Sequence, residues 1–127
     1  DGWYEWTGEK GKKQPWHIHL KTREPLFLAA ISALGPCREH ACEAGFVIVT
    51  DDASGGMLDI HDRRPVVLDA QDAERWLDPA LSSEEALALA RSAALPPDAF
   101  VWHEVSTQVN RAGAGGPEVA QPIDSDA

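Results

Sequence analysis

Two stretches near the start of the chain alternate apolar and polar residues with a period of two. They cover residues 3–6 and 15–20, and a segment rich in glycine and lysine separates them. The pattern predicts two strands joined by a hairpin turn, because successive side chains of a strand point to opposite faces. In the second strand the aromatic and aliphatic residues form the buried face. His17, His19 and Lys21 then lie on a face that we expect to be exposed.

Further along, short apolar runs bounded by turn residues predict more strands. They cover residues 26–32, 46–50, 66–68 and 100–105. We expect the first of these runs to be buried. Two helices are predicted at residues 70–77 and 86–93, where Asp69 and Ser82 are suitable N-caps. The alanine-rich faces of both helices favour packing on a sheet, whereas residues 33–44 show no period and are predicted to be a loop.

Length, charge and cysteine content narrow the class of protein. A chain of 127 residues with 43% hydrophobic and 25% charged residues suits one globular domain. Its net charge of −10 argues against a general binder of nucleic acid or anionic lipid. The charge is uneven, however: residues 1–40 carry six basic and five acidic side chains, and residues 41–127 carry five basic and sixteen acidic ones. An anionic partner would therefore meet the first third of the chain.

No apolar run approaches the ~20 residues of a membrane span, and no targeting signal is visible. Two cysteines are too few for a disulfide scaffold, so a reducing compartment, the cytosol, is the simpler expectation.

Glu5 is a candidate acid/base residue because it lies between Tyr4 and Trp6. A carboxylate beside large aromatic side chains loses solvation, which raises its pKa toward a useful range. A strand glutamate that points to solvent is the alternative interpretation.

His61 is the second candidate, since it lies in a run of charged residues between apolar ones. Asp62 could orient its imidazole, and the guanidinium groups of Arg63 and Arg64 could bind an anion. The alternative is a structural loop held by ion pairs.

Two groups of residues have spacings that a metal ion could use. Cys37, His40 and Cys42 form C-x2-H-x-C, which offers three ligands but no fourth nearby, so an idle loop explains them better. His17 and His19 lie two residues apart on one strand face and could chelate a metal, but an exposed face explains them as simply. We therefore predict neither metal nor cofactor. The sequence also contains no glycine-rich phosphate loop, no H-E-x-x-H and no G-x-S-x-G.

Four segments taken together resemble a known family. They are D-G-W-Y-E-W at residues 1–6, K-Q-P at 13–15, F-V-I-V-T at 46–50 and D-I-H-D-R-R-P at 59–65. In order and spacing they are similar to the C-terminal half of the SOS response-associated peptidase (SRAP) family, whose members handle abasic sites in single-stranded DNA. The resemblance continues through W-H-E-V-S at residues 102–106 and fades near Pro122.

This resemblance implies an α+β fold, with a curved, mostly antiparallel sheet or open barrel and peripheral helices. Residues 1–111 would be the C-terminal portion of one SRAP domain, incomplete without the N-terminal half, and residues 112–127 a tail with a disordered end. In the family, an N-terminal cysteine forms a thiazolidine with the aldehyde of the lesion, assisted by an asparagine of the first half. Neither residue has a match here. The chain also begins without Met inside an aromatic strand, so we expect a fragment or a processed half.

Site residues follow from the resemblance motif by motif. Glu5 matches the glutamate of D-G-x-x-E-W, which assists proton transfers at the amine and in removal of the initiator Met. His61 matches the histidine of H-x-R-x-P, which acts as general acid/base during ring opening and contacts the phosphate of the lesion. Thr50, Trp6 and Arg63 would contact the DNA and the lesion.

The preferred hypothesis is thus an abasic-site processing protein of the SOS response that forms a DNA–protein crosslink. The complete protein would be a cytosolic, nucleoid-associated monomer that binds single-stranded DNA and no membrane. One alternative is a truncated, non-catalytic single-stranded DNA-binding module. A peptidase acting on other proteins ranks last, because no serine, cysteine or metal protease site is present. DNA contacts would be confined to a basic strip, for which the candidates are Lys10, Lys12, Lys13, Lys21 and Arg23.

Overall fold

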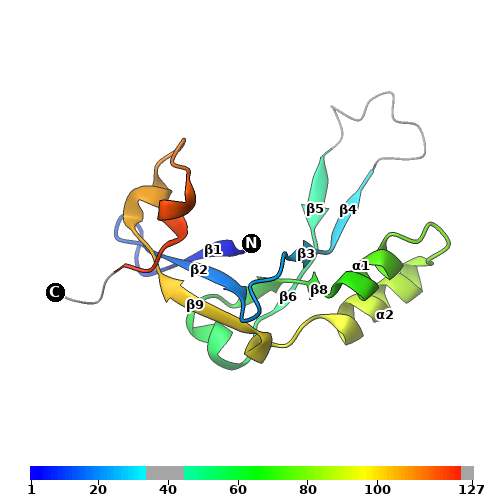
Figure 1. Cartoon of the computed structure of the whole chain (residues 1–127). Coiled ribbons are helices and arrows are strands. Elements are labelled where there is room, and N and C mark those ends of the chain that lie inside the picture. Colours follow the sequence, from blue (N-terminus) through cyan, green and yellow to red (C-terminus); the bar gives the residue numbers. More distant parts are fainter. Residues whose placement is uncertain (34–44, 124–127) are drawn as a thin grey trace. The chain divides into compact units, whose positions relative to one another are not determined.

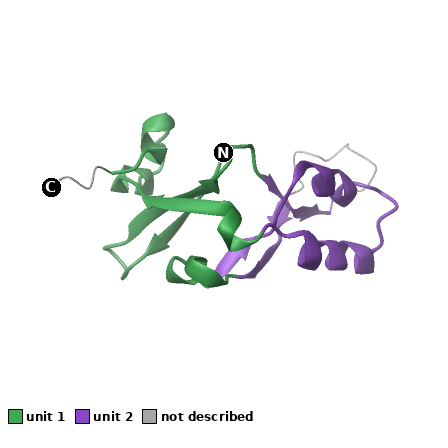
Figure 2. Cartoon of the chain, turned by 60° about the horizontal axis from the view of Figure 1, so that its bottom comes forward, with its two compact units in different colours: residues 1–26, 53–62, 96–127 green, residues 27–52, 63–95 purple. Residues whose placement is uncertain are grey.

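The structure, a computed structural model, describes residues 1–33 and 45–123. These residues form two compact units, each assembled from segments that are distant in the sequence (Figure 1, Figure 2). Unit 1 contains residues 1–26, 53–62 and 96–127, and unit 2 contains residues 27–52 and 63–95. The chain therefore passes from one unit to the other four times. Cys37, His40 and Cys42 lie outside the described residues, as does the end of the predicted tail.

Unit 1 is built on a three-stranded antiparallel sheet in the order β1-β2-β9. Its strands are β1 (Trp3–Thr7), β2 (Gln14–Leu20) and β9 (Phe100–Glu104). All three strands were predicted within two residues of these bounds. Gly8 and Gly11 lie in the turn between β1 and β2 with φ values of 96° and 90°, the left-handed region that glycine adopts without strain. The predicted hairpin is thus confirmed.

One face of this sheet forms the core of unit 1. Trp3 pairs with Ile18, and the Trp3 ring meets the Phe100 ring edge-on with 5.4 Å between centroids. Ile18 and Phe100 are each 2% exposed. Because side chains alternate along a strand, Glu5 shares this face with Trp3.

The opposite face of the sheet is also covered, which corrects the expectation of an exposed histidine face. His17 and His19 are only 4% and 3% exposed. The Tyr4 ring lies 5.1 Å from the His17 ring, and His103 on β9 is the direct cross-strand partner of His17. Burial, with smaller contributions from His103 and His19, lowers the pKa of His17 to about 4. Alternation predicted one buried face, whereas tertiary packing buries both.

The described residues of unit 1 also form four 3-10 helices. They are η1 (Gly55–Asp59), η2 (Pro97–Ala99), η3 (Thr107–Asn110) and η4 (Pro117–Ala120). Val105, which is fully buried, follows β9 and forms a bridge with Pro122. The chain after β9 therefore returns to the end of the sheet.

The part of unit 2 that the structure describes contains three antiparallel pairs of short strands, β3 with β8, β4 with β5, and β6 with β7. Their bounds are β3 (Phe27–Leu28), β4 (Ala30–Ser32), β5 (Phe46–Ile48), β6 (Thr50–Asp52), β7 (Arg63–Pro65) and β8 (Val67–Leu68). The predicted strands at 26–32 and 46–50 are thus each broken in two. They break at Ala29 and Val49, because Ala29 N–H donates to the Val66 carbonyl and Val49 N–H donates to the Ala29 carbonyl. The strands change partners at these points.

Both predicted helices are present in unit 2, as α1 (Ala70–Trp76) and α2 (Ser83–Ala93). The Asp69 side chain accepts a hydrogen bond from Asp72 N–H, and Ser82 and Glu85 form a capping box. Unit 2 has a small core of buried residues, and partly buried alanine and tryptophan side chains of the helices pack against it. Its buried members are Ala29, Val66, Leu68 and Ala90. The mixed α+β class with antiparallel strands is therefore confirmed. The strands formed by residues 1–33 and 45–123 do not form a closed barrel.

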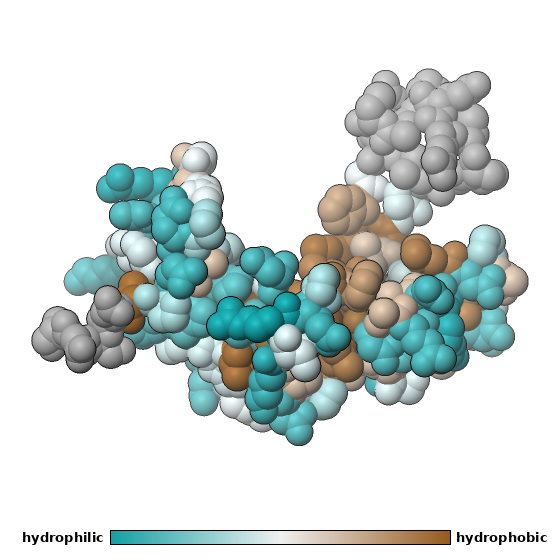
Figure 3. Space-filling model, in the orientation of Figure 1, coloured by the Kyte–Doolittle hydropathy of each residue, from teal (hydrophilic) through white to brown (hydrophobic). Residues whose placement is uncertain are grey.

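The ribbon of β4 and β5 exposes large apolar side chains (Figure 3). Ile31 is 58% exposed, Phe46 70% and Val47 64%. The expectation of a buried strand at residues 26–32 is therefore wrong, since Ala29 alone of these residues is buried and Phe27 is also exposed. None of the helices formed by the described residues is long and apolar enough to cross a membrane.

Candidate functional site

Glu5 lies in the middle of β1, half-buried, with Trp16 as its cross-strand partner. Desolvation by its aromatic surroundings raises the pKa of Glu5 above the ordinary 4.5, and the charge of Asp62 adds to this. The His61 imidazole and the Trp3 indole N–H act in the opposite direction. Trp3 lies near enough to favour the carboxylate, although its buried Nε1 forms no hydrogen bond of good geometry. The sequence-based expectation of a raised pKa at Glu5 is confirmed in direction.

His61 follows η1 and is held by the backbone around it. Its N–H donates to the carbonyl of Met57, a residue only 3% exposed, at 3.0 Å. Ala53 N–H donates to the Asp62 carbonyl at 2.8 Å, which closes the 53–62 segment at its ends. The His61 ring is thereby carried on a short loop anchored by a buried methionine.

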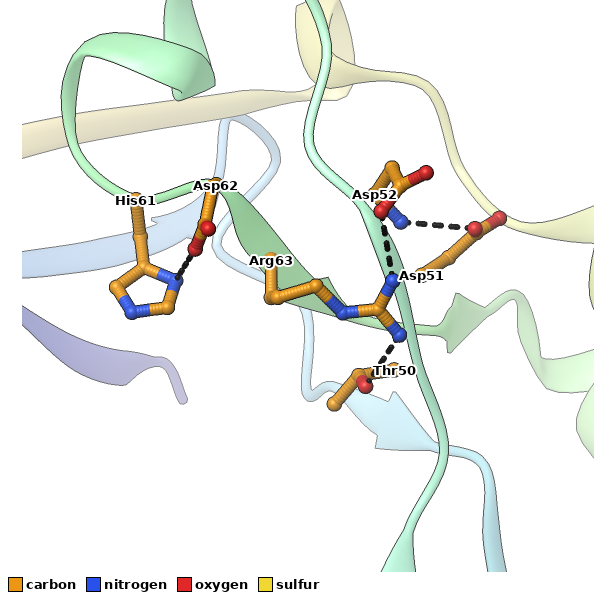
Figure 4. Close-up of polar contacts among 6 residues, drawn as sticks. All are labelled: Thr50, Asp51, Asp52, His61, Asp62 and Arg63. Carbon is orange, nitrogen blue, oxygen red and sulfur yellow. Dashed lines mark hydrogen bonds and ion pairs between the residues drawn. The ribbon is translucent and has the colours of Figure 1, made fainter.

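The His61 imidazole also has an orienting carboxylate, as the sequence suggested. Nδ1 lies 3.2 Å from Asp62 Oδ1, and the two side chains are 44% and 87% exposed (Figure 4). A proton on Nδ1 faces this carboxylate, which orients the ring. Because His61 influences the pKa of Glu5, the carboxylate and the imidazole belong to one electrostatic neighbourhood in unit 1. This pair can move protons.

Thr50 and Arg63 form a second arrangement, in unit 2. The Arg63 guanidinium donates to Asp52 Oδ1 at 2.7 Å and to Thr50 Oγ1 at 2.8 Å (Figure 4). Thr50 and Asp52 can both reach it because they lie two residues apart on one face of β6, and Asp52 is the cross-strand partner of Arg63. These two hydrogen bonds fix the guanidinium group of Arg63. The side chain is still 45% exposed, so the group also reaches solvent. Of this arrangement, Asp52 was missed by sequence reasoning.

Arg64 corrects the expectation that two neighbouring guanidinium groups would bind one anion. It is only 6% exposed, whereas Arg63 is half-exposed. Adjacent residues of a strand point to opposite faces, so the R-R pair cannot act as one clamp.

Trp6 is not brought together with Glu5. It lies next to Glu5 on β1 and therefore points to the other face of the sheet, where its ring lies 6.4 Å from that of Tyr4. Its indole N–H donates to the side chain of Asn110. Asn110 also lines an open hollow of about 550 Å³ that two exposed lysines make basic. The hollow is lined by Gly11, Lys12, Lys13, Gln14, Thr107 and Asn110.

Comparison with known proteins identifies the family of this chain. A family profile described as SOS response associated peptidase (SRAP) matches residues 1–112. The chain belongs to the SRAP family. It is 42% identical over 123 residues to the abasic site processing protein YedK of Escherichia coli, an alignment that covers 97% of this chain and 55% of YedK. It is 32% identical over 146 residues to the abasic site processing protein HMCES of Gallus gallus, covering 98% of this chain and 42% of HMCES.

Two solved structures have a similar fold. A phage-related protein from Bordetella bronchiseptica is 46% identical, with a TM-score of 0.67 over 83% of this chain and 50% of that protein. A protein from Bacteroides thetaiotaomicron, 24% identical with a TM-score of 0.70, shares the fold. This SRAP chain spans about half the length of the curated relatives it matches.

Within this SRAP chain, the raised pKa of Glu5 leads to a test of stability. The folded-state pKa exceeds the ordinary value, so the carboxylate costs folding free energy once pH rises above that value. We expect Glu5→Gln to raise the Tm of the complete protein at pH 7 by about 1–3 °C. The gain should vanish as pH falls below about 4, where Glu5 is protonated in both states.

Thermal melts of wild type and variant at pH 4 and pH 7 measure this difference. Glu104→Gln is the matched control, since it removes an exposed carboxylate from β9 of the same sheet. Equal effects of the two substitutions at both pH values would show that burial of Glu5 is not the cause.

Proposed function

We propose that this chain is the C-terminal portion of an SRAP protein that processes abasic sites in single-stranded DNA through a covalent crosslink. The observation that carries the proposal is the electrostatic coupling of a partly buried carboxylate, Glu5, with the oriented imidazole of His61 in unit 1. These are the two residues that the family motifs single out. The relatives named as abasic site processing proteins support the substrate class.

The reaction joins the ring-opened aldehyde of the lesion to an N-terminal cysteine from the preceding portion of the protein. The amine adds to the aldehyde carbon, the thiol closes the ring, and one water is released with formation of the thiazolidine. As the sugar ring opens, His61 takes the proton from the hydroxyl group on the anomeric carbon and delivers a proton to the ring oxygen. Glu5, whose pKa is raised by burial, takes the proton from the amine and assists removal of the initiator Met.

Thr50 and Arg63 are proposed to contact the DNA backbone. A guanidinium fixed by Asp52 and Thr50 needs little ordering before it meets a phosphate, and its exposure permits that contact. Trp6 is proposed to contact DNA bases from the other face of its sheet, beside the hollow that carries Lys12 and Lys13.

The apolar ribbon of β4 and β5 supports the view that another portion of the protein completes the fold. Side chains such as Phe46 and Val47 are mostly exposed, and soluble domains seldom leave such residues together in water. We infer that the preceding portion covers this ribbon and extends the sheets into the open barrel that the family resemblance implies.

The test compares the complete protein with the chain that starts at Asp1. Each is incubated with single-stranded DNA that contains one abasic site, and with the same DNA carrying a tetrahydrofuran analogue that has no aldehyde. A denaturing gel should show a shifted band for the complete protein with the aldehyde-bearing DNA alone. A shifted band with the analogue, or none with the complete protein, contradicts the crosslink. Reversible binding without a crosslink would instead favour the non-catalytic DNA-binding module.

A further inference from the structure

Three imidazole rings meet on the face of the unit 1 sheet that is turned away from Glu5. His17 and His19 lie two residues apart on β2, and His103 is the cross-strand partner of His17 on β9. The ring centroids are 5.6 Å apart for His17–His19, 5.6 Å for His17–His103 and 5.7 Å for His19–His103. The three rings thus form a nearly equilateral triangle. Two of them are buried and the third is half-buried.

The spacing of the ring nitrogens suits a transition-metal ion. One nitrogen from each ring lies within 4.8 Å of the other two. Ligand nitrogens at about 2.0–2.1 Å from a tetrahedral Zn²⁺ are about 3.3 Å apart, so shifts of about 1 Å would bring all three to one ion. Three histidines and one open position is a common zinc arrangement.

Two of the rings already have the outer hydrogen bond that metal-bound histidines make. His19 Nδ1 lies 2.8 Å from the Leu20 carbonyl, and His103 Nε2 lies 2.8 Å from the Ala120 carbonyl. A carbonyl only accepts, so each of these nitrogens carries the proton. The other nitrogen, Nε2 of His19 and Nδ1 of His103, then has the lone pair that binds a metal.

The third ring holds a buried polar atom that the protein leaves unsatisfied. His17 Nδ1 is buried and has no hydrogen-bond partner among the described residues. Such atoms are uncommon in folded proteins and call for an explanation. A ligand shared with His19 and His103 would fix this ring and offset its burial.

We propose that His17, His19 and His103 bind one divalent transition-metal ion, of the Zn²⁺ type, which links β2 to β9. Imidazole ligands suit Zn²⁺, Ni²⁺ and Cu²⁺ and do not suit Mg²⁺ or Ca²⁺. The positive charge of Arg23 acts on His17 and would also repel a metal cation. The affinity for the metal ion must therefore come from the three imidazole nitrogens. Through its bond to Ala120, His103 also connects the ion to the end of η4. The three histidines lie on the face of the sheet opposite Glu5 and include neither of the two proposed acid/base residues.

The test uses the complete protein, stripped with EDTA and dialysed, and Zn²⁺ as the probe. Calorimetry should show one Zn²⁺ bound per chain, with a Tm that rises on adding Zn²⁺ and does not change with Mg²⁺. Co²⁺ in place of Zn²⁺ should give the visible absorption of a tetrahedral nitrogen site. Replacing one ligand, as in His19→Gln or His103→Gln, should weaken binding by about 100-fold or more.

Two matched variants separate this site from the other groups that could bind metal. His61→Gln removes a histidine outside the triangle, and Cys37→Ser with Cys42→Ser removes the C-x2-H-x-C thiols. Both should bind Zn²⁺ as wild type does. Binding lost in the cysteine variant, thiolate absorption with Co²⁺, or no binding at all would overturn the proposal. Because a triangle variant could unfold, ring-nitrogen NMR shifts on adding Zn²⁺ to wild type provide a second measurement. These must change at His17, His19 and His103.

Discussion

Replacing His61 by Ala in the complete protein is expected to slow crosslinking to abasic DNA by about 100-fold or more. General acid/base groups contribute 10² to 10⁴ in rate, and Asp62, whose carboxylate contacts Nδ1 of this ring, cannot substitute for it. The measurement is the single-turnover rate of band formation on a denaturing gel. The variant should remain folded, since the His61 side chain is 44% exposed and Met57 and Ile60 anchor the loop.

Two neighbouring substitutions sharpen this prediction. Asp62→Asn keeps the imidazole and removes its orienting charge, so a smaller loss of about 10-fold is expected. Asp59→Asn removes an exposed carboxylate from the same segment and should leave the rate unchanged. If His61→Ala crosslinked as fast as Asp59→Asn, the acid/base role of His61 would be refuted.

Gly2→Ala is expected to destabilise the complete protein by about 2–3 kcal/mol. A Cβ at this position would overlap the backbone oxygen of Ile18 and the ring of His17. The oxygen belongs to a paired strand and cannot move aside without disturbing the β1–β2 register. The glycine of the D-G-x-x-E-W motif is therefore a packing requirement that lets β1 approach β2.

Urea unfolding of Gly2→Ala measures this cost as a lower midpoint with an unchanged slope. Gly115→Ala is the control, because nothing lies within 4 Å of a Cβ built there. Equal midpoints for the two variants would show that the chain around Gly2 relaxes freely.

Local pattern was enough to predict much of unit 1. Residues 3–6 and 15–20 alternate so regularly that their strands and hairpin follow from the period of two, and capping residues located both helices of unit 2. The same period places Trp6 and Glu5 on opposite faces, a consequence that the family resemblance obscured. The direction of the pKa shift at Glu5 was predicted correctly, but from Tyr4 and Trp6, which point to the other face; burial on its own face is what raises it.

Long-range contacts decided the features that the sequence did not predict. Ala29 and Val49 interrupt their strands because their backbone groups pair with distant residues. The histidine face is buried because β9 supplies His103, 86 residues beyond His17. The Arg63 fork depends on the register of β6 with β7, which places Asp52 opposite it. None of these pairings has a local signal.

The four passages of the chain between units impose an order on folding. Within unit 1 the β1–β2 hairpin is made before its third strand, β9, which lies about 80 residues later, and a two-stranded hairpin is at best marginally stable alone. During synthesis, unit 1 must therefore wait for the last quarter of the chain, while unit 2 has all its segments once residue 95 is made. A chain that stops before β9 carries Glu5 on a two-stranded hairpin that lacks the third strand of its sheet.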